Sequence, residues 1–299
     1  MLDLSQVFHL FSTIFTQVMK NLFIAAILLL LSTSCQKALD PIIIPKETPF
    51  EVMPVRLTQN VLLEHFSDES KSSTISDTYY AGQLAQKFPG RLYITNFHLN
   101  DFLATSYSNY LATLLGGLIN VSKGAINRQT GIQTSGQEDG LIWLSPVNWE
   151  AAIKRALKTN EAPLALSIET GVAANGKGYV NIFIAHREII TADTRIMIYL
   201  VEDNIQPIFQ VDMLPGFLHQ NVFMDVIPSF EGQPVDLSYV EAKGSIKKLT
   251  FQNIVLEKYN LVNLKIIALA YSNHPDFNRK QILNVQEAHF YGNHYWDVE

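Results

Sequence analysis

The stretch VLLEHFSDESKSSTISDTYYAGQLAQKFPG, residues 61–90, indicates how the fold begins. Residues 61–66 form a short apolar run bounded by polar residues, which is typical of a buried strand. Residues 67–73 are polar and predict a loop, and residues 74–77 (TISD) resemble a capping box at the start of a helix. The apolar side chains of this helix recur at i, i+4 and i+8 and are Tyr80, Leu84 and Phe88. Pro89-Gly90 ends the pattern, so the stretch predicts a strand, a loop and a helix.

The following seventy residues continue to alternate between the two kinds of element. A second strand is predicted at 91–98 and a second helix at 102–114, stopped by Gly116-Gly117. Two short strands follow at 124–127 and 141–144, before a helix that starts near Ser145-Pro146 or at Asn148. This order predicts an α/β domain over residues 59–159.

The hydrophobic period changes to two after Asn160. Asn175-Gly176 is a hairpin signal, because these residues accept a positive φ at low cost. Further strands are predicted at 164–168, 180–184, 195–202, 205–211, 220–227, 246–256, 262–271 and 281–289. Turn residues separate them at short intervals, which favours an antiparallel β-sandwich over residues 160–299. The predicted fold class is therefore α/β plus all-β.

The N-terminal segment has the features of a leader. Leu22 to Leu31 is an unbroken apolar run of about ten residues, long enough for a signal-peptide core and too short to span a bilayer. Met19-Lys20-Asn21 supplies a compact positive start before it. Residues 1–18 contain no Lys or Arg, so we interpret them as a start-site artefact or a leader extension and residues 19–34 as the signal peptide.

Cys35 is the only cysteine of the chain, and small residues lead directly into it. This resembles a bacterial lipobox, in which the cysteine becomes the lipid-bearing first residue, since two or more acyl chains give stable membrane attachment. The alternative is a secretory signal with a chance cysteine. An acylated Cys35 would leave no thiol for a disulfide or a cysteine metal site. Residues 35–58 contain four prolines and predict an extended tether.

Five stretches, taken in order, resemble one known family. They are NVLLEHF (60–66), GAINR (124–128), YLVEDNIQ (199–206), HQNVF (219–223) and QILNVQEAHF (281–290). Together they are similar to the Bacteroides-type lipoprotein family named for a 28-kDa outer membrane protein. The resemblance implies an outer-membrane lipoprotein with a thioredoxin-like domain followed by a β-sandwich, and adhesion is among the roles proposed for the family.

The redox residues that the resemblance implies are absent. Many members carry a CxxC pair between the first strand and the first helix, and the two positions fall here on Lys71 and Thr74. Neither side chain can supply the thiolate that disulfide exchange needs. Ser122 stands where the fold expects a cis-proline. The resemblance therefore implies a scaffold that has lost redox chemistry.

Other chemistry finds little support in the sequence. Ser72, Ser73 and Thr74 lie near Glu64, His65, Asp68 and Glu69, but a polar loop that caps a helix explains them more simply than a catalytic triad. His219-Gln220-Asn221 predicts a turn entering a strand, and Glu202-Asp203-Asn204 predicts a hairpin turn rather than a cation site. His289 and His294 lie in an aromatic tail that favours an edge strand over a metal or sugar platform. We therefore expect no catalytic residue, no cofactor and no metal.

Function is the least determined expectation. Net charge is −6, with no basic excess for nucleic acid. We expect a lipid-anchored outer-membrane module for binding, adhesion or envelope assembly, with a protein or glycan partner bound through the β-domain. A structural, periplasm-facing envelope lipoprotein and a residual enzyme at the loop 67–74 are the alternatives, and the exposed membrane face is left open.

Overall fold

The computed structural model describes residues 50–114, 123–129, 143–159, 161–275 and 280–297. Cys35, Ser122, the leader and the first part of the tether lie outside these residues, so their predicted roles remain predictions. Residues Thr48–Glu299 form one compact unit. Among the described residues, no helix is long and apolar enough to cross a membrane.

The first part of the described chain alternates strands and helices, as the sequence predicts. Its elements are β1 (Val61–Ser67), α2 (Ser73–Lys87), β2 (Leu92–His98), α3 (Ser106–Leu114), β3 (Lys123–Ile126), β4 (Trp143–Leu144) and α4 (Pro146–Ala156). Helix α4 starts as predicted, with Ser145 as N-cap and Pro146 in the first turn, where its missing N–H is not needed.

The second part contains strands only. They are β5 (Leu164–Val172), β6 (Gly178–His186), β7 (Thr194–Glu202), β8 (Val222–Ile227), β9 (Gln233–Val235), β10 (Ser245–Ile254), β11 (Leu264–Ser272), β12 (Ile282–His289) and β13 (Asn293–His294). The predicted hairpin joins β5 to β6, and Gly176 has the positive φ of 76° that its turn requires. The predicted edge strand at the C-terminus is β13, which pairs with β5.

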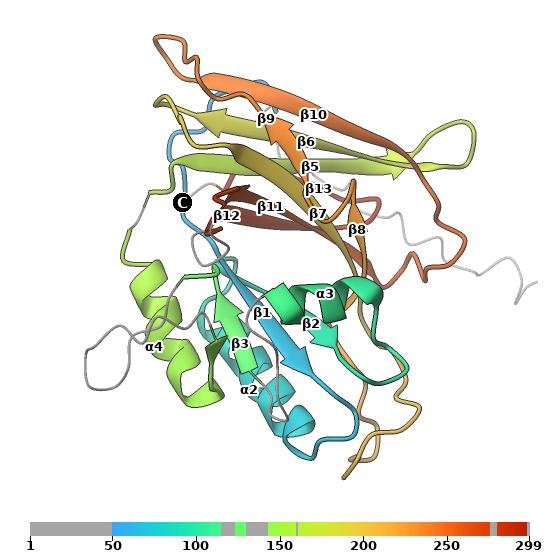
Figure 1. Cartoon of the computed structure of the whole chain (residues 1–299). Helices are drawn as coiled ribbons and strands as arrows, with labels where there is room; N and C mark the ends of the chain where they lie inside the picture. Colours follow the sequence, from blue (N-terminus) through green and yellow to red (C-terminus); the bar gives the residue numbers. More distant parts are fainter. Residues whose placement is uncertain (1–49, 115–122, 130–142, 160, 276–279, 298–299) are drawn as a thin grey trace, which may run out of the picture. The chain divides into compact units, whose positions relative to one another are not determined.

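The strands form two sheets (Figure 1). One is nine-stranded, in the order β12-β11-β7-β8-β2-β1-β3-β4 with β9 beside β7, and the other has the order β10-β6-β5-β13. Strands β1 and β2 are parallel, and β2 is parallel to β8 through the pair Asn96 and Val222. The strands after residue 160 pair with one another only in antiparallel fashion. One sheet therefore runs through both predicted domains.

Alternating side chains of β1 and β2 face two different cores. Val61 and Leu63 pack with α2 and α4, whose Trp149 is fully buried there. Leu62 and Phe66 point the other way, where α3 covers the sheet and strands β7, β8, β11 and β12 contribute the remaining side chains. Figure 1 shows α2 and α4 on one side of β1–β3 and α3 on the other. This arrangement explains why these strands read as continuous apolar runs rather than alternating ones.

A third core lies between the two sheets. The inward residues of β5 and β6 pack against those of β7 and β11, including Ile182, Ile198 and Ile266, all fully buried. The period of two in the sequence therefore marks strands with one face on this core. The opposite faces of β7 and β11 contribute to the α3 core, so these two strands are also covered on both sides.

A buried ion pair lies in the core beneath α3. Arg128 binds Glu64 through two N–H···O bonds of 2.9 and 2.8 Å, and the Tyr199 hydroxyl lies 2.8 Å from the Glu64 carboxylate and 2.7 Å from the guanidinium. The side chains of Glu64 and Arg128 are 0% and 2% exposed. We call Glu64, Arg128 and Tyr199 the core ion pair. Every charge in it has a partner, which is the condition for keeping ions in an apolar core.

Residues 205–211 are not a strand, and this prediction was wrong. Pro207 lacks the N–H that a sheet needs, and only Ile205 keeps an isolated bridge, to His219. Glu202-Asp203-Asn204 is correspondingly not a tight hairpin turn. The whole of residues 203–221, which we call the 203–221 loop, connects β7 to β8.

Three further local predictions need correction. The capping box at 74–77 is absent, because α2 begins one residue earlier, at Ser73, and its N-cap Ser72 makes no side-chain cap. Helix α3 begins at Ser106 rather than at residue 102. The end of the predicted tether is also packed: Phe50 stacks on Phe183 and Tyr295, and Leu57 is buried.

Candidate functional site

A pocket of about 630 Å³ lies between helix α2, strand β2 and the 203–221 loop. We call it the α2 pocket. Its size falls in the range of roughly 300–1,000 Å³ that small-ligand sites occupy. The lining residues are Thr78, Tyr79, Ala81, Gly82, Gln83, Gln86, Ile94, Asn96, Asp203, Gly216, Phe217, Leu218, Gln220 and Asn221.

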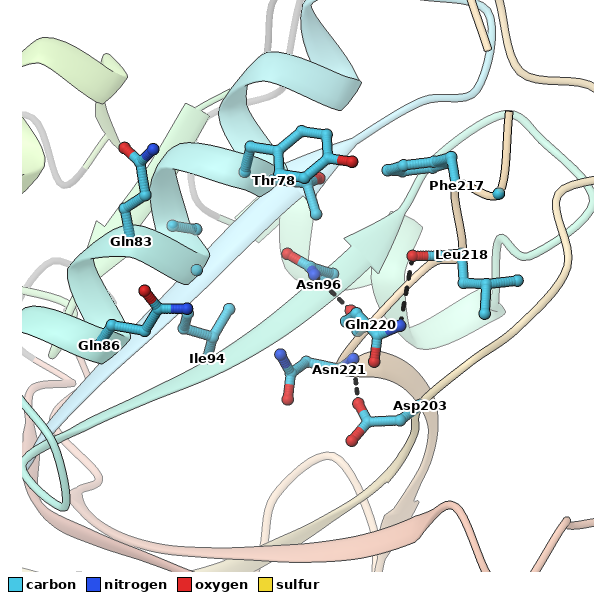
Figure 2. A pocket seen from close by; sticks show the side chains of 14 residues that line it. Thr78, Gln83, Gln86, Ile94, Asn96, Asp203, Phe217, Leu218, Gln220 and Asn221 are labelled. Atoms are coloured by element: carbon cyan, nitrogen blue, oxygen red, sulfur yellow. Dashed lines mark hydrogen bonds between the residues drawn. The ribbon is translucent and has the colours of Figure 1, made fainter. Parts of the chain in front are cut away.

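Helix α2 supplies one wall. Figure 2 shows Gln83 and Gln86 projecting from this helix, across from Phe217 and Leu218 of the loop. Gly82 lies in the same wall, and a Cβ added there would meet no atom within 4 Å. The wall is therefore open at its centre, with exposed amide side chains beside the opening.

The floor is a chain of hydrogen bonds between buried groups. Asn96 donates to the carbonyl of Gln220 at 2.5 Å (Figure 2). The side-chain oxygen of Asn96 lies 2.7 Å from Nδ1 of His65. Burial, opposed by the bond to Asn96, lowers the pKa of His65 to about 4, so the ring is neutral at neutral pH and Nδ1–H donates. This fixes the Asn96 amide rigidly beneath the pocket.

The loop side of the pocket carries one acidic side chain, Asp203, which already has partners. Its carboxylate accepts from the backbone N–H of Asn221 at 2.7 Å and pairs with Lys265 at 3.0 Å. Asn221 has a positive φ of 54° immediately before β8, as expected of a turn entering a strand. The lining therefore offers neutral polar groups and no uncompensated charge.

Two aromatic rings flank the entrance. Tyr79 is 54% exposed, and its ring centroid is 6.2 Å from that of the buried Phe217. The loop beyond them also exposes apolar side chains, namely Ile208, Phe209, Met213 and Leu214. Apolar groups that gather on one loop in this way mark interaction surfaces.

A buried group of two acids and two histidines fixes this loop to the rest of the protein. His219 Nε2 lies 3.0 Å from the Glu69 carboxylate, and His98 Nδ1 lies 2.7 Å from Asp101. The two imidazole rings meet edge to face at 4.6 Å, and Asp101 also accepts from the backbone N–H of Glu69 at 2.9 Å. We call these four residues the acid–histidine cluster. The described residues contain no group of acids and histidines that could hold a metal ion, this cluster included.

Burial sets the protonation of the cluster. It lowers the pKa of His219 to about 4, with His98 adding to the effect, so His219 is neutral at neutral pH. Burial and the nearby Asp101 raise the pKa of Glu69. Burial opposes ionisation of Asp101, but hydrogen bonds from His98 and from two backbone N–H groups hold its pKa below the usual value. Asp101 is therefore charged at neutral pH, and the imidazole that the loop contributes through His219 is neutral.

Backbone bonds strengthen the same attachment. Val211 N–H donates to the carbonyl of Glu69 at 2.9 Å, and the Gln210 side chain donates to the carbonyl of Lys71 at 3.2 Å. The 203–221 loop is thus held against residues 69–71, the part of the β1–α2 connection where the sequence predicts a lost active site.

Lys71 and Thr74, the two positions that the resemblance aligns with a CxxC pair, lie just before and within the first turn of α2. Thr74 is fully buried in the first turn, and its hydroxyl donates to the carbonyl of Asp68 at 2.6 Å. Lys71 belongs to the turn that precedes the helix and is linked to it by the bond from Thr74 N–H. Both residues have structural contacts in this turn.

The structure does not gather the acids, histidine and serines of the 64–73 region into one site. Glu64 binds Arg128, His65 binds Asn96, Asp68 accepts from Ser70 N–H, and Glu69 binds His219. In the tail, His294 pairs with Asp297 at 3.0 Å, whereas His289 is exposed. These residues therefore serve separate contacts.

Sequence reasoning missed Asn96, Asp101 and the role of Gly82. Asp101 follows a strand predicted to end at His98. An acidic residue just after the carboxyl end of a strand was the signal that could have indicated a site. His219-Gln220-Asn221 was singled out as a turn, which is correct, but its contact with Glu69 spans 150 positions and has no local signature.

Comparison with known proteins gives two solved structures of similar fold. HBP35 of Porphyromonas gingivalis matches with a TM-score of 0.65 and 16% identity, over 78% of this chain and 76% of that one. A structural-genomics protein from Agrobacterium tumefaciens matches with a TM-score of 0.53 and 12% identity, over 81% of this chain and 99% of that one. At such identities the likeness concerns the fold alone. A comparison with curated proteins finds no match.

The family comparison is more specific than the structural ones. The model for outer membrane protein Omp28 matches residues 117–293, which is more than half of the chain. The match includes four of the five stretches on which the resemblance rests, and it includes the part of the α2 pocket formed by the 203–221 loop. This chain belongs to the Omp28 family of outer membrane proteins.

Proposed function

We propose that the chain is a lipid-anchored outer-membrane protein that binds a ligand or partner in the α2 pocket without catalysing a reaction. Cys35 is the anchor in this proposal. Residues 59–159 form a degenerate thioredoxin-like domain, an assignment supported by the parallel β1–α2–β2 unit with helices on both faces. Residues 160–299 form a β-sandwich, supported by the core between the two sheets.

One observation carries the binding role. The α2 pocket combines a hydrogen-bonded polar floor, an open helix wall and the exposed ring of Tyr79 at its entrance, and the acid–histidine cluster holds its loop side in place. Sites built on side chains that are fixed by buried contacts bind with less loss of conformational entropy.

Loss of redox chemistry follows from the two residues at the start of α2. Thr74 is closed off by burial, and neither Thr74 nor Lys71 can form a thiolate. A residual enzyme at 67–74 would need a nucleophile beside a base, and the histidines of this region, His65 and His219, bind Asn96 and Glu69 instead.

Photo-crosslinking in intact cells tests binding at the pocket. We expect Tyr79→p-benzoylphenylalanine to give a product of higher mass on irradiation, because this exposed side chain lies at the pocket entrance. The matched control is Tyr239→p-benzoylphenylalanine, since Tyr239 is similarly exposed, at 63%, and does not line the α2 pocket. Equal products from both positions, or none from position 79, would contradict the proposal and favour a purely structural envelope lipoprotein.

Fractionation of cells that express Cys35→Ala tests the anchor. We expect the variant to move from the outer-membrane fraction to the soluble fraction, because the acyl chains that hold the protein would be missing. Measurement is by immunoblot of both fractions, with Ser34→Ala as the control. Full retention of Cys35→Ala in the membrane would show that the lipid anchor is wrong.

A further inference from the structure

Gly82 has no packing role in the structure. Gly82 lies inside α2, where glycine destabilises a helix by roughly 1 kcal/mol relative to alanine. Two reasons usually justify this cost, a positive φ or a close neighbour, and neither applies, since a Cβ at Gly82 would meet nothing within 4 Å. The space that the missing side chain leaves opens directly into the α2 pocket.

The charge of the lining excludes most ionic ligands. Asp203 is the one acidic side chain among the lining residues, and Lys265 and the Asn221 N–H already satisfy it. No lysine, arginine or histidine lines the pocket. A phosphate, carboxylate or ammonium group would lose its hydration there without gaining a counter-charge. The occupant is therefore uncharged where it enters.

The polar groups suit hydroxyls. The side-chain amides of Gln83 and Gln86 are exposed beside the pocket, and each offers a donor and an acceptor side by side. A hydroxyl also donates and accepts, so neighbouring hydroxyls match an amide in both roles. The exposed ring of Tyr79 adds a flat apolar surface at the entrance, of the kind that packs against the C–H face of a sugar ring.

We infer that the α2 pocket binds a neutral saccharide, with Gly82 kept small to admit a sugar ring, Gln83 and Gln86 bonded to its hydroxyls and Tyr79 stacked on its apolar face. This inference rests on the proposed binding function and narrows it to one ligand class. A peptide is the competing class and is distinguished below.

Binding is measured with purified full-length protein in detergent, by saturation-transfer NMR and calorimetry. The probes are maltohexaose, cellohexaose, mannohexaose and N-acetylchitohexaose. We expect at least one to bind and Gly82→Leu to weaken this binding by roughly tenfold or more, because the leucine side chain fills the pocket. Gly82→Ala is the matched control, since it adds a single methyl group in open space, and it should change binding much less.

Chemical denaturation of Gly82→Leu shows whether weaker binding comes from a filled pocket or from loss of the fold. A Cβ at position 82 meets no neighbour, and leucine favours the helix over glycine, so Gly82→Leu should unfold at the same or higher denaturant concentration. Tyr79→Ala should also weaken saccharide binding, whereas Tyr239→Ala should leave saccharide binding unchanged. Binding that survives both Gly82→Leu and Tyr79→Ala would overturn the inference.

The outcomes separate this inference from the proposed function. Suppose that none of the four saccharides binds but that position 79 gives a crosslinked product that protease removes. This result would overturn the inference of a saccharide ligand and leave the proposed binding at the pocket intact. No saccharide binding and no crosslink at position 79 would overturn both.

Discussion

The core ion pair and the acid–histidine cluster are both buried polar groups, but they differ in what they join. The core ion pair links β1, the turn after β3 and β7 inside an apolar core, where burial opposes the charge of Arg128 but the Glu64 carboxylate raises the pKa of Arg128 above its usual value. The acid–histidine cluster links the end of β2 with three connections, namely β1–α2, β2–α3 and the 203–221 loop, and the pKa shifts of Glu69 and His219 favour their neutral forms. The first stabilises the fold, whereas the second positions the site.

The same difference appears in their surroundings. Aromatic rings surround the core ion pair, and Arg128 lies 5.8 Å from the ring centroid of Tyr271. The acid–histidine cluster instead includes His219 of the 203–221 loop. This loop carries the exposed side chains of Ile208 and Phe209. A buried polar group therefore indicates function here only where one of its partners belongs to a connection that lines a pocket.

Breaking the core ion pair should have the largest effect. Arg128→Met leaves the Glu64 carboxylate buried without its counter-charge, and we expect a loss of about 3–5 kcal/mol in the free energy of unfolding. Chemical denaturation followed by tryptophan fluorescence measures it. If the single variant does not fold, the double variant Glu64→Leu/Arg128→Met should recover part of the stability, because no unpaired charge remains.

The control for this prediction is a surface ion pair. Glu150 binds Lys87 and Lys154 at 2.7 and 2.5 Å, with both lysines about half exposed. Glu150→Ala should lower the free energy of unfolding far less than Arg128→Met does, because water screens this exposed pair. Equal losses for Arg128→Met and Glu150→Ala would show that burial of the core ion pair does not matter.

Acid should weaken the protein through the two neutral histidines. The pKa values of His65 and His219 are about 4 when folded, against 6.5 when unfolded, so between these values the unfolded chain binds more protons. The free energy of unfolding should therefore fall as the pH drops from 7 to 5, by about 2 kcal/mol for each histidine. Glu69 opposes this, because its raised pKa lets the folded state take up a proton first.

Denaturation at pH 7, 6 and 5 measures the effect, and histidine variants assign it. His219→Gln should remove its share of the pH dependence, whereas His289→Gln should leave it unchanged, because His289 is exposed. A pH dependence that is the same in the native chain and in His219→Gln would show that the acid–histidine cluster does not titrate as described.

Much of the local structure was predictable. The start of α4 at Ser145-Pro146, the turn at Asn175-Gly176 and the change of period near residue 160 all depend on neighbouring residues, and all are present. Local prediction failed where two local rules competed. At 205–211 the apolar residues indicated a strand, but Pro207 cannot donate to a ladder. At 74–77 the Thr74 hydroxyl donates to the carbonyl of Asp68 instead of capping the helix.

By itself the sequence determined the order and approximate bounds of most elements and the absence of thiols at Lys71 and Thr74, because these depend on residue type and short spacing. Only the tertiary structure decided that one sheet crosses both parts of the chain, that His219 meets Glu69, and that Gly82 opens a pocket. These contacts join residues far apart in sequence, and hydrogen bonding and burial select them only once the strands have paired.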